Sequence, residues 1–223
     1  MASWSKPSRD LLGSDRSDYH RPMLLQIVIV STREGRKGDA VAHWFETRAR
    51  AHGAFDVELV DLAEVNLPLF DEPNHPRLRR YQHEHTKRWS ERVTRADAFV
   101  FVTPEYNYSA PPSIVNALDY LVHEWAYKPL AFVSYGGVSG GTRSVQVIKL
   151  QATALRMMPI PEAVSLPFFG NMFATDGSFR PDDTQQKAAD AMLNELKRWA
   201  SALRVLRKSL TSAEHCERKG TAS

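Results

Sequence analysis

Two kinds of apolar pattern alternate along the chain. Short runs that are almost wholly apolar and rich in β-branched residues are typical of strands covered on both faces. They lie at residues 24–30, 57–60, 99–102, 131–133 and 163–166. Between them, apolar residues recur at steps of three and four, which is typical of helices with one buried face. This spacing occupies residues 39–52, 78–93, 115–125, 145–152 and 181–206. The pattern predicts strands that alternate regularly with helices.

Strands that alternate with helices form right-handed βαβ units, so the predicted fold class is α/β with a parallel sheet. The five predicted strands fit a doubly wound, flavodoxin-like sheet with the strand order 2-1-3-4-5. Ligands of such sheets bind beyond the carboxyl ends of the strands, which places the chemistry in the loops after strands one, three and four. We expect residues 23–207 to form one domain, with residues 1–22 as a flexible leader and residues 208–223 as a flexible tail.

Charge and cysteine content exclude several classes of protein. The net charge of +3 lacks the clustered basic excess of a nucleic-acid-binding protein. No run approaches about 18 apolar residues, so we expect no membrane span. The single cysteine, Cys216, cannot form an internal disulfide, which indicates a reducing, cytoplasmic setting. His83 and His85 lack a third ligand in a suitable place, so we expect no metal site.

The loop after the first predicted strand, STREGRKGD, has features of a phosphate site. The hydroxyl of Ser31 can donate to a phosphate oxygen, and Arg33 and Arg36 add positive charge. Gly38 allows close backbone approach at the positive end of the following helix. The alternative is a solvated basic turn in which Asp39 caps the helix. The loop matches neither the P-loop nor the G-x-G-x-x-G pattern, which favours a mononucleotide over a dinucleotide.

Two further loops suit a flat heterocycle. The third predicted strand ends in PEYNYSAPP, a stiff loop with aromatic and polar groups, although a purely structural turn would use the same composition. The fourth ends in SYGGVSGGTR, where glycines allow the backbone to pass close to a ligand, although a mobile loop is the alternative.

These motifs carry a resemblance to a known family. PEYNYSAPP with the following NALD, and SYGGVSGGTR after Lys128-Pro129, resemble the signatures of the NADPH-dependent FMN reductases, over about residues 24–170. The chain departs from that family at Val30, where many members have glycine. The resemblance implies that Ser31 and Arg33 grip the FMN phosphate. It implies that the flavin ring and ribityl chain contact the following residues: Pro104, Glu105, Tyr106, Asn107, Ser134, Tyr135, Gly136 and Gly137.

The resemblance also implies the reaction. NADPH or NADH passes hydride to bound FMN, and a small-molecule acceptor (a quinone, an azo compound, a free flavin or a metal oxyanion) then takes the electrons. The flavin carries this chemistry, so no catalytic side chain is expected. The resemblance implies a homodimer or homotetramer, and an apolar face at Leu121, Trp125 and Tyr127 is our candidate for part of the contact. The alternatives are a flavodoxin-like electron carrier and an interaction protein that senses the state of its flavin.

Overall fold

The sheet confirms the predicted fold class and strand order. The computed structural model describes residues 21–220, with side chains up to Arg207. Its five strands are all parallel and follow the order β2-β1-β3-β4-β5. They are β1 (Leu24–Ile29), β2 (Asp56–Asp61), β3 (Ala98–Pro104), β4 (Pro129–Tyr135) and β5 (Met158–Leu166).

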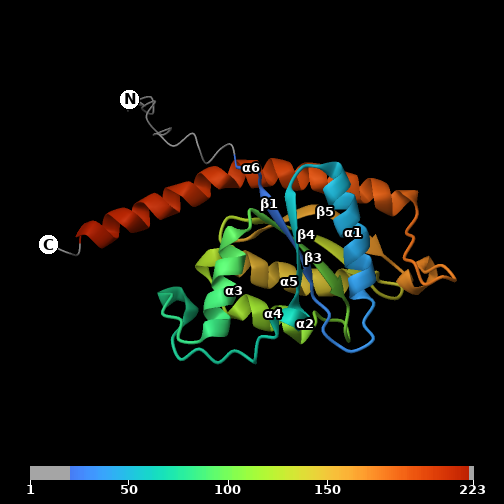
Figure 1. Ribbon diagram of the computed structural model, residues 1–223, viewed down its shortest axis with the longest axis horizontal. Coiled ribbons are helices and arrows are strands. Elements are labelled where there is room, and N and C mark those ends of the chain that lie inside the picture. Colours follow the sequence, from blue (N-terminus) through green and yellow to red (C-terminus); the bar gives the residue numbers. More distant parts are fainter. Residues whose placement is uncertain (1–20, 221–223) are drawn as a thin grey trace, which may run out of the picture.

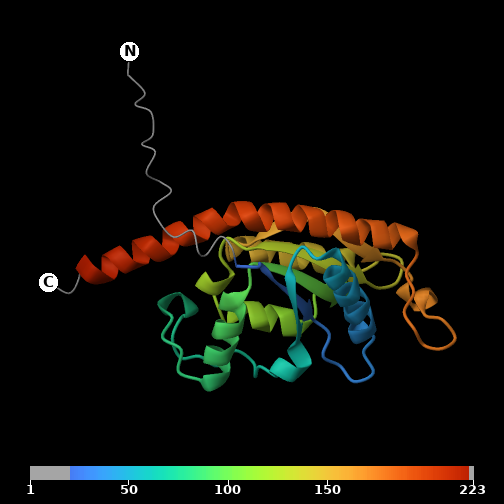
Figure 2. The ribbon, with the colours of Figure 1, turned by 45° about the horizontal axis from the view of Figure 1, so that its top comes forward.

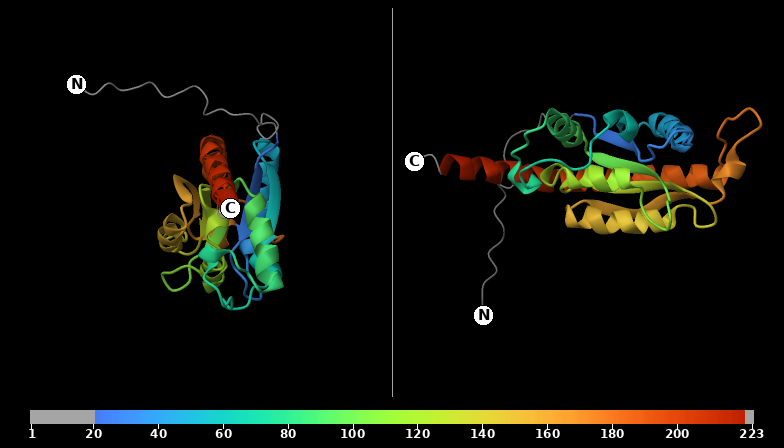
Figure 3. Two further views of the ribbon diagram at one scale, coloured as in Figure 1. Left: turned by 90° about the vertical axis from the view of Figure 1, so that its left-hand side faces the viewer. Right: turned by 90° about the horizontal axis from the view of Figure 1, so that it is seen from below.

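Helices cover both faces of the sheet (Figures 1 and 3). On one face lie α1 (Gly38–His52) and α6 (Asp183–Gly220), and on the other lie α3 (Glu84–Arg95), α4 (Pro112–Asp119) and α5 (Thr142–Ala154). The short elements are α2 (Leu62–Val65), η3 (Pro76–Leu78), η4 (His123–Trp125) and η5 (Phe169–Met172). Within the part of the chain that the structure describes, no helix is long and apolar enough to cross a membrane.

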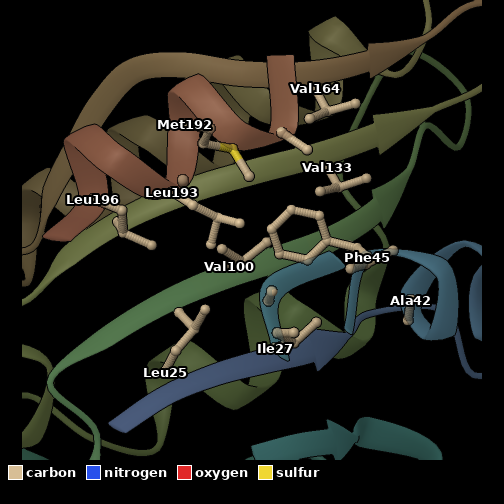
Figure 4. Packing of buried hydrophobic residues seen from close by; sticks show 14 of the residues in the cluster. Leu25, Ile27, Ala42, Phe45, Val100, Val133, Val164, Met192, Leu193 and Leu196 are labelled. Carbon is tan, nitrogen blue, oxygen red and sulfur yellow. The ribbon is translucent and has the colours of Figure 1, made fainter. Parts of the chain in front are cut away.

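Each face of the sheet has its own apolar core. Figure 4 shows the core under α1 and α6, where side chains of both helices point at alternate residues of the strands. The labelled members are Leu25, Ile27, Ala42, Phe45, Val100, Val133, Val164, Met192, Leu193 and Leu196. The other core packs α3, α4 and α5 around Trp89 and Trp125, whose rings lie 5.8 Å apart. These buried faces fix the strands, and therefore the loops at their carboxyl ends.

The apolar face proposed for subunit contact is not a surface. Leu121 and Trp125 are fully buried in the core beneath α3 and α4, and Tyr127 is half-buried. The prediction was wrong because α4 ends at Asp119 and the chain then turns inward through η4, instead of continuing as one amphipathic helix to Trp125.

Several element boundaries differ from the sequence pattern. β5 begins at Met158, ahead of the predicted start at residue 163, and includes Pro159 and Pro161, which an edge strand tolerates. α6 begins at Asp183 because the carboxylate of Asp182 accepts from the backbone N–H of Thr184 at 2.7 Å.

The far end of α6 also differs from the pattern. The helix was expected to end near residue 206, but it continues to Gly220 and passes beyond the edge of the sheet (Figure 2). The predicted leader falls on residues outside the described part of the chain, apart from residues 21 and 22.

Candidate flavin site

The predicted loops converge at the carboxyl edge of the sheet, where they line a pocket of about 170 Å³. The loop after β1, the loop after β3 and the end of β4 all contribute, together with the segment after β5 (Figure 1). The lining residues are Arg33, Arg36, Lys37, Pro104, Glu105, Tyr106, Tyr135, Gly136 and Phe169. The structure therefore brings together residues from all of the loops that the sequence singled out.

A hydroxyl pair lies at the base of the first loop. Tyr135 donates its phenolic proton to Ser31 Oγ over 3.2 Å, and both side chains are buried. Burial raises the pKa of Tyr135 to about 12, so the phenol stays protonated and remains a donor at neutral pH. A Cβ at position 38 would stand 2.3 Å from Ser31 Oγ and 2.5 Å from the Tyr135 hydroxyl oxygen. A side chain at position 38 would therefore displace this hydroxyl pair where α1 begins.

The basic residues of the loop after β1 have two different roles. Arg36 holds Asp61 through both guanidinium nitrogens, with Nη1 to Oδ1 at 2.9 Å, and also donates to the carbonyl of Ser31 at 3.0 Å. It therefore braces the loop against the end of β2. Arg33 and Lys37 are exposed and line the pocket. Lys37 directly precedes α1, and its Nζ lies 5.5 Å from the centre of the Phe173 ring. Basic residues beside a helix N-terminus suit an anion.

The loop after β3 forms a tight turn. Tyr106 and Ser109 exchange two backbone hydrogen bonds of 3.0 and 2.8 Å, and Asn107 and Tyr108 between them have φ values of 48° and 65°. Both central residues are left-handed, which costs free energy for a tyrosine and fixes the direction of the exposed loop tip. Arg143 stacks on the Tyr108 ring with its guanidinium carbon 4.1 Å from the ring centre.

Glu105 joins the loop after β3 to the loop after β4. Its carboxylate accepts from the Ser139 hydroxyl at 2.9 Å, from the Arg143 backbone N–H at 3.1 Å and from Arg143 Nη1 at 2.6 Å. Burial opposes ionisation, but the hydrogen bonds from Arg143 and Ser139 outweigh it and lower the pKa of Glu105 below its usual range. The carboxylate is thus charged at neutral pH and lies at the N-terminal end of α5.

The glycine-rich loop is held against the end of β5. The Gly136 N–H donates to the Leu166 carbonyl at 3.3 Å, and the Phe168 N–H donates to the Gly137 carbonyl at 2.9 Å. Gly137 is exposed, whereas Ser134 is buried inside β4. Glycine is needed at position 141, where φ is 82° and a Cβ would stand 2.8 Å from the backbone nitrogen of Tyr135.

The residues present fit the phosphate end of FMN. Two exposed cations, Arg33 and Lys37, line the pocket beside a helix N-terminus, and the Tyr135–Ser31 hydroxyl pair packs against Gly38 behind them. The individual contacts predicted for Pro104, Tyr106, Asn107, Ser134 and the glycines stay predictions. Glu105, Arg36 and Ser134 are already engaged or buried within the protein, which indicates supporting roles.

Sequence reasoning missed two pocket residues, Lys37 and Phe169. Lys37 directly precedes Gly38, and its position beside that glycine was a usable signal. Phe169 follows β5, a loop that the strand-order argument did not consider, and its ring lies 4.9 Å from that of Tyr135. The rings of His83 and His85 stack on each other with their centres 5.1 Å apart. Among the described residues, no group of three or more side chains that could hold a metal ion is found.

Comparison with known proteins shows the family of the chain. Residues 23–171 match the NADPH-dependent FMN reductase family. The chain is 40% identical over 144 residues to the NAD(P)H-dependent FMN reductase of Schizosaccharomyces pombe, covering 63% of this chain and 72% of that protein. It is 31% identical over 128 residues to a quinone reductase of Pseudomonas putida, covering 54% and 67% of the two chains.

Solved structures confirm the fold. The flavoenzyme NAD(P)H:acceptor oxidoreductase FerB of Paracoccus denitrificans superposes with a TM-score of 0.65 at 22% identity, covering 81% of this chain and 98% of that one. The family match spans both predicted signatures and the loops that line the pocket. This chain belongs to the NADPH-dependent FMN reductase family.

Proposed function

We propose that the protein is an FMN-dependent NAD(P)H oxidoreductase that reduces a small-molecule acceptor. The observation that carries the proposal is the convergence of the phosphate loop, the Pro-Glu-Tyr-Asn loop and the glycine-rich loop on one pocket. Relatives named as NAD(P)H-dependent FMN reductases and quinone reductases support it. Bound FMN would supply the hydride and electron chemistry.

The protein's own residues bind and orient the cofactor. Arg33 and Lys37 would pair with the phosphate, while the Tyr135–Ser31 hydroxyl pair and Gly38 shape the surface behind it. Glu105 would hold the two ring-framing loops at a fixed separation through Ser139 and Arg143. A site fixed in this way is preorganised, so little binding energy is lost in ordering it.

The finer properties follow from the resemblance. We expect NADPH or NADH as the reductant, a homodimer or homotetramer, and a cytoplasmic location in keeping with the single cysteine. No nucleic acid is expected as a partner, because the net charge is only +3.

An absorbance spectrum of the purified protein between about 300 and 600 nm tests the proposal, because bound flavin is the coloured group that it requires. We expect flavin bands that bleach within seconds when NADPH is added without oxygen. Flavin bands that persist would instead favour an electron carrier or a sensing protein. A colourless protein that ignores added FMN would refute flavin binding.

A further inference from the structure

A pocket of about 190 Å³ lies at the edge of the sheet opposite the flavin loops. Residues of η3, of η4 and of the end of α5 line it, and η4 and α5 directly precede the amino ends of β4 and β5. Its volume is below the range of about 300–1,000 Å³ that drug-sized ligands fill. The pocket therefore suits a small molecule better than a nucleotide.

The lining of this pocket combines basic and apolar side chains. Arg77, His123 and Arg156 supply the basic groups, and none of the described residues in the lining is acidic. The remaining lining residues are Val122, Ala126, Ala154 and Leu155. Guanidinium groups beside apolar side chains suit an oxyanion that is attached to a small apolar body.

Neither arginine of the pocket has an anionic partner within the described protein. Among the residues that the structure describes, no carboxylate lies within ion-pair distance of Arg77 or Arg156. The basic residues at the end of α3 differ, since Arg92 and Arg95 both pair with Glu58. Two guanidinium groups that line one pocket without a carboxylate repel each other, and a bound oxyanion would offset that repulsion.

Arg156 has a backbone conformation that favours glycine. Its φ is 59°, and it follows the C-terminal end of α5, where a left-handed residue is usually glycine. Its side chain is not needed to cap the helix, because the N–H groups of Arg156 and Met157 donate to the carbonyls of Thr153 and Ala152 at 3.0 and 2.9 Å. A side chain that is present at a conformational cost is typical of a ligand-binding position.

Hydrogen bonds between segments hold the three basic residues in place. His123 Nε2 lies 3.0 Å from the Arg77 carbonyl oxygen, which joins η4 to η3. The Tyr127 N–H donates to the Arg156 carbonyl at 2.8 Å, and Arg207 Nη1 donates to the Tyr127 carbonyl at 2.8 Å. The backbone of the pocket is therefore ordered before a ligand arrives, which lowers the entropy lost on binding.

We propose that this pocket is an anion-binding site separate from the flavin site. Its ligand carries one oxyanion group, a phosphate or a carboxylate, on a small apolar body. Arg77 and Arg156 bind the oxyanion, and the apolar lining contacts the body of the ligand. The proposal does not depend on flavin chemistry, because no residue of this pocket lines the flavin pocket.

Calorimetric titration of the full-length protein, saturated with FMN to fill the flavin site, tests the proposal. The probes are two matched pairs: phenyl phosphate with inorganic phosphate, and benzoate with acetate. We expect one aromatic probe to bind at least about fivefold more tightly than its small partner, because the apolar lining adds to the affinity. The tighter of the two aromatic probes identifies the oxyanion. Absence of binding by all four probes at millimolar concentration, or equal affinities within both pairs, would overturn the proposal.

Arg156→Gly and Arg77→Gln test the two guanidinium groups separately. We expect each change to weaken binding of the tighter probe about tenfold, as for the loss of a charged hydrogen-bonding partner. In the absence of ligand, Arg156→Gly should keep or raise the midpoint of urea unfolding, because glycine relieves the left-handed backbone. Lys197→Gln, which removes one exposed charge from α6, is the matched control and should bind the probe as wild type does.

Two results would refute the site. Unchanged binding in both arginine variants would show that the probe binds elsewhere, and an equal loss in Lys197→Gln would show that only net charge attracts it. If Arg156→Gly lowers the unfolding midpoint, its side chain serves the fold and Arg77→Gln decides the proposal. A protein that takes up no FMN would refute the flavin proposal, whereas the difference between wild type and the arginine variants would still decide this one.

Discussion

The carboxylate of Glu105 links two loops. Replacing Glu105 by glutamine removes its negative charge and changes few atoms, so this variant tests the role of the charge. In Glu105→Gln we expect the dissociation constant of FMN to rise about fivefold at pH 7. That corresponds to about 1 kcal/mol, a small value because the Arg143 partner is partly exposed. Titration of the apoprotein with FMN, followed by flavin fluorescence, measures the change.

The pH dependence of this effect has a definite sign. The pKa of Glu105 is lowered in the folded protein, so its contribution is complete above the usual glutamate range and is lost as the pH falls through the lowered value. The difference between wild type and Glu105→Gln should therefore be full at pH 7 and shrink under acidic conditions. Glu84→Gln, at an exposed pair with Lys87, is the control and should leave FMN binding unchanged. A constant difference at all pH values would contradict the charge-based role.

At the scale of single residues, the sequence predicts which residue types lie in a loop but not which partners they bind. The residue types that favour a phosphate site were visible in the first loop, and its glycine at position 38 packs against the Ser31 and Tyr135 hydroxyl groups. The sequence could not show that Arg36 turns to Asp61, 25 positions away, or that Glu105 pairs with Arg143, 38 positions away. Those pairings depend on which strands become neighbours, because β1 adjoins β2 and β3 adjoins β4 in the sheet.

A buried lysine side chain binds the C-terminal end of α3. Lys128 Nζ donates to the carbonyls of Val93 and Thr94 at 2.6 and 3.0 Å and lies over the ring of Phe99. It thereby satisfies backbone groups that a helix C-terminus leaves without partners and joins α3 to the start of β4. Burial, with a further contribution from the nearby Arg207, lowers the pKa of Lys128 to about 7.

This pKa predicts a rise of stability with pH. Between about pH 7 and pH 10 the unfolded chain holds a proton on Lys128 that the folded protein lacks, so raising the pH favours folding. Lys128→Met should remove a slope of at most about 1.4 kcal/mol per pH unit in the free energy of unfolding. Urea unfolding at several pH values measures it. Lys197→Met, at an exposed position on α6, is the control. Parallel pH profiles for wild type and Lys128→Met would refute the assignment.

Elements were predicted well where apolar runs are long, and less well where tertiary contacts set their ends. The three inner strands, β1, β3 and β4, were predicted from their apolar runs because both of their faces are buried. α3 was expected from residue 78 but begins at Glu84, because the Glu72 carboxylate binds the N–H groups of Gln82 and His83 and orders the chain before the helix. No local pattern predicts a contact between residues ten positions apart in an irregular loop.

Residues from both ends of the described chain meet at Asp97, which is 2% exposed. Arg21 binds its carboxylate at 3.0 Å and Arg207 at 2.8 Å, Arg204 Nε lies 3.7 Å away, and the Leu24 N–H donates at 2.9 Å. One buried carboxylate before β3 thus fastens α6 and the start of β1 to the edge opposite the flavin loops. The sequence gives no sign of this junction, since its members are up to 186 positions apart, from residue 21 to residue 207.

Asp97→Asn tests how far the molecule depends on this junction. The amide keeps the shape of the side chain but removes the buried negative charge that Arg204 and Arg207 bind, and breaking a buried ion pair costs about 3 kcal/mol. We expect chemical denaturation to show a loss of that order. In Asp190→Asn, where the pair with Arg48 joins α1 to α6 at the surface, the loss should stay below about 1 kcal/mol. Equal losses in the two variants would mean that the junction is no more than another surface ion pair. A large loss confined to Asp97→Asn, with FMN affinity retained, would show that the molecule is stabilised at one edge of the sheet while it binds its cofactor at the other.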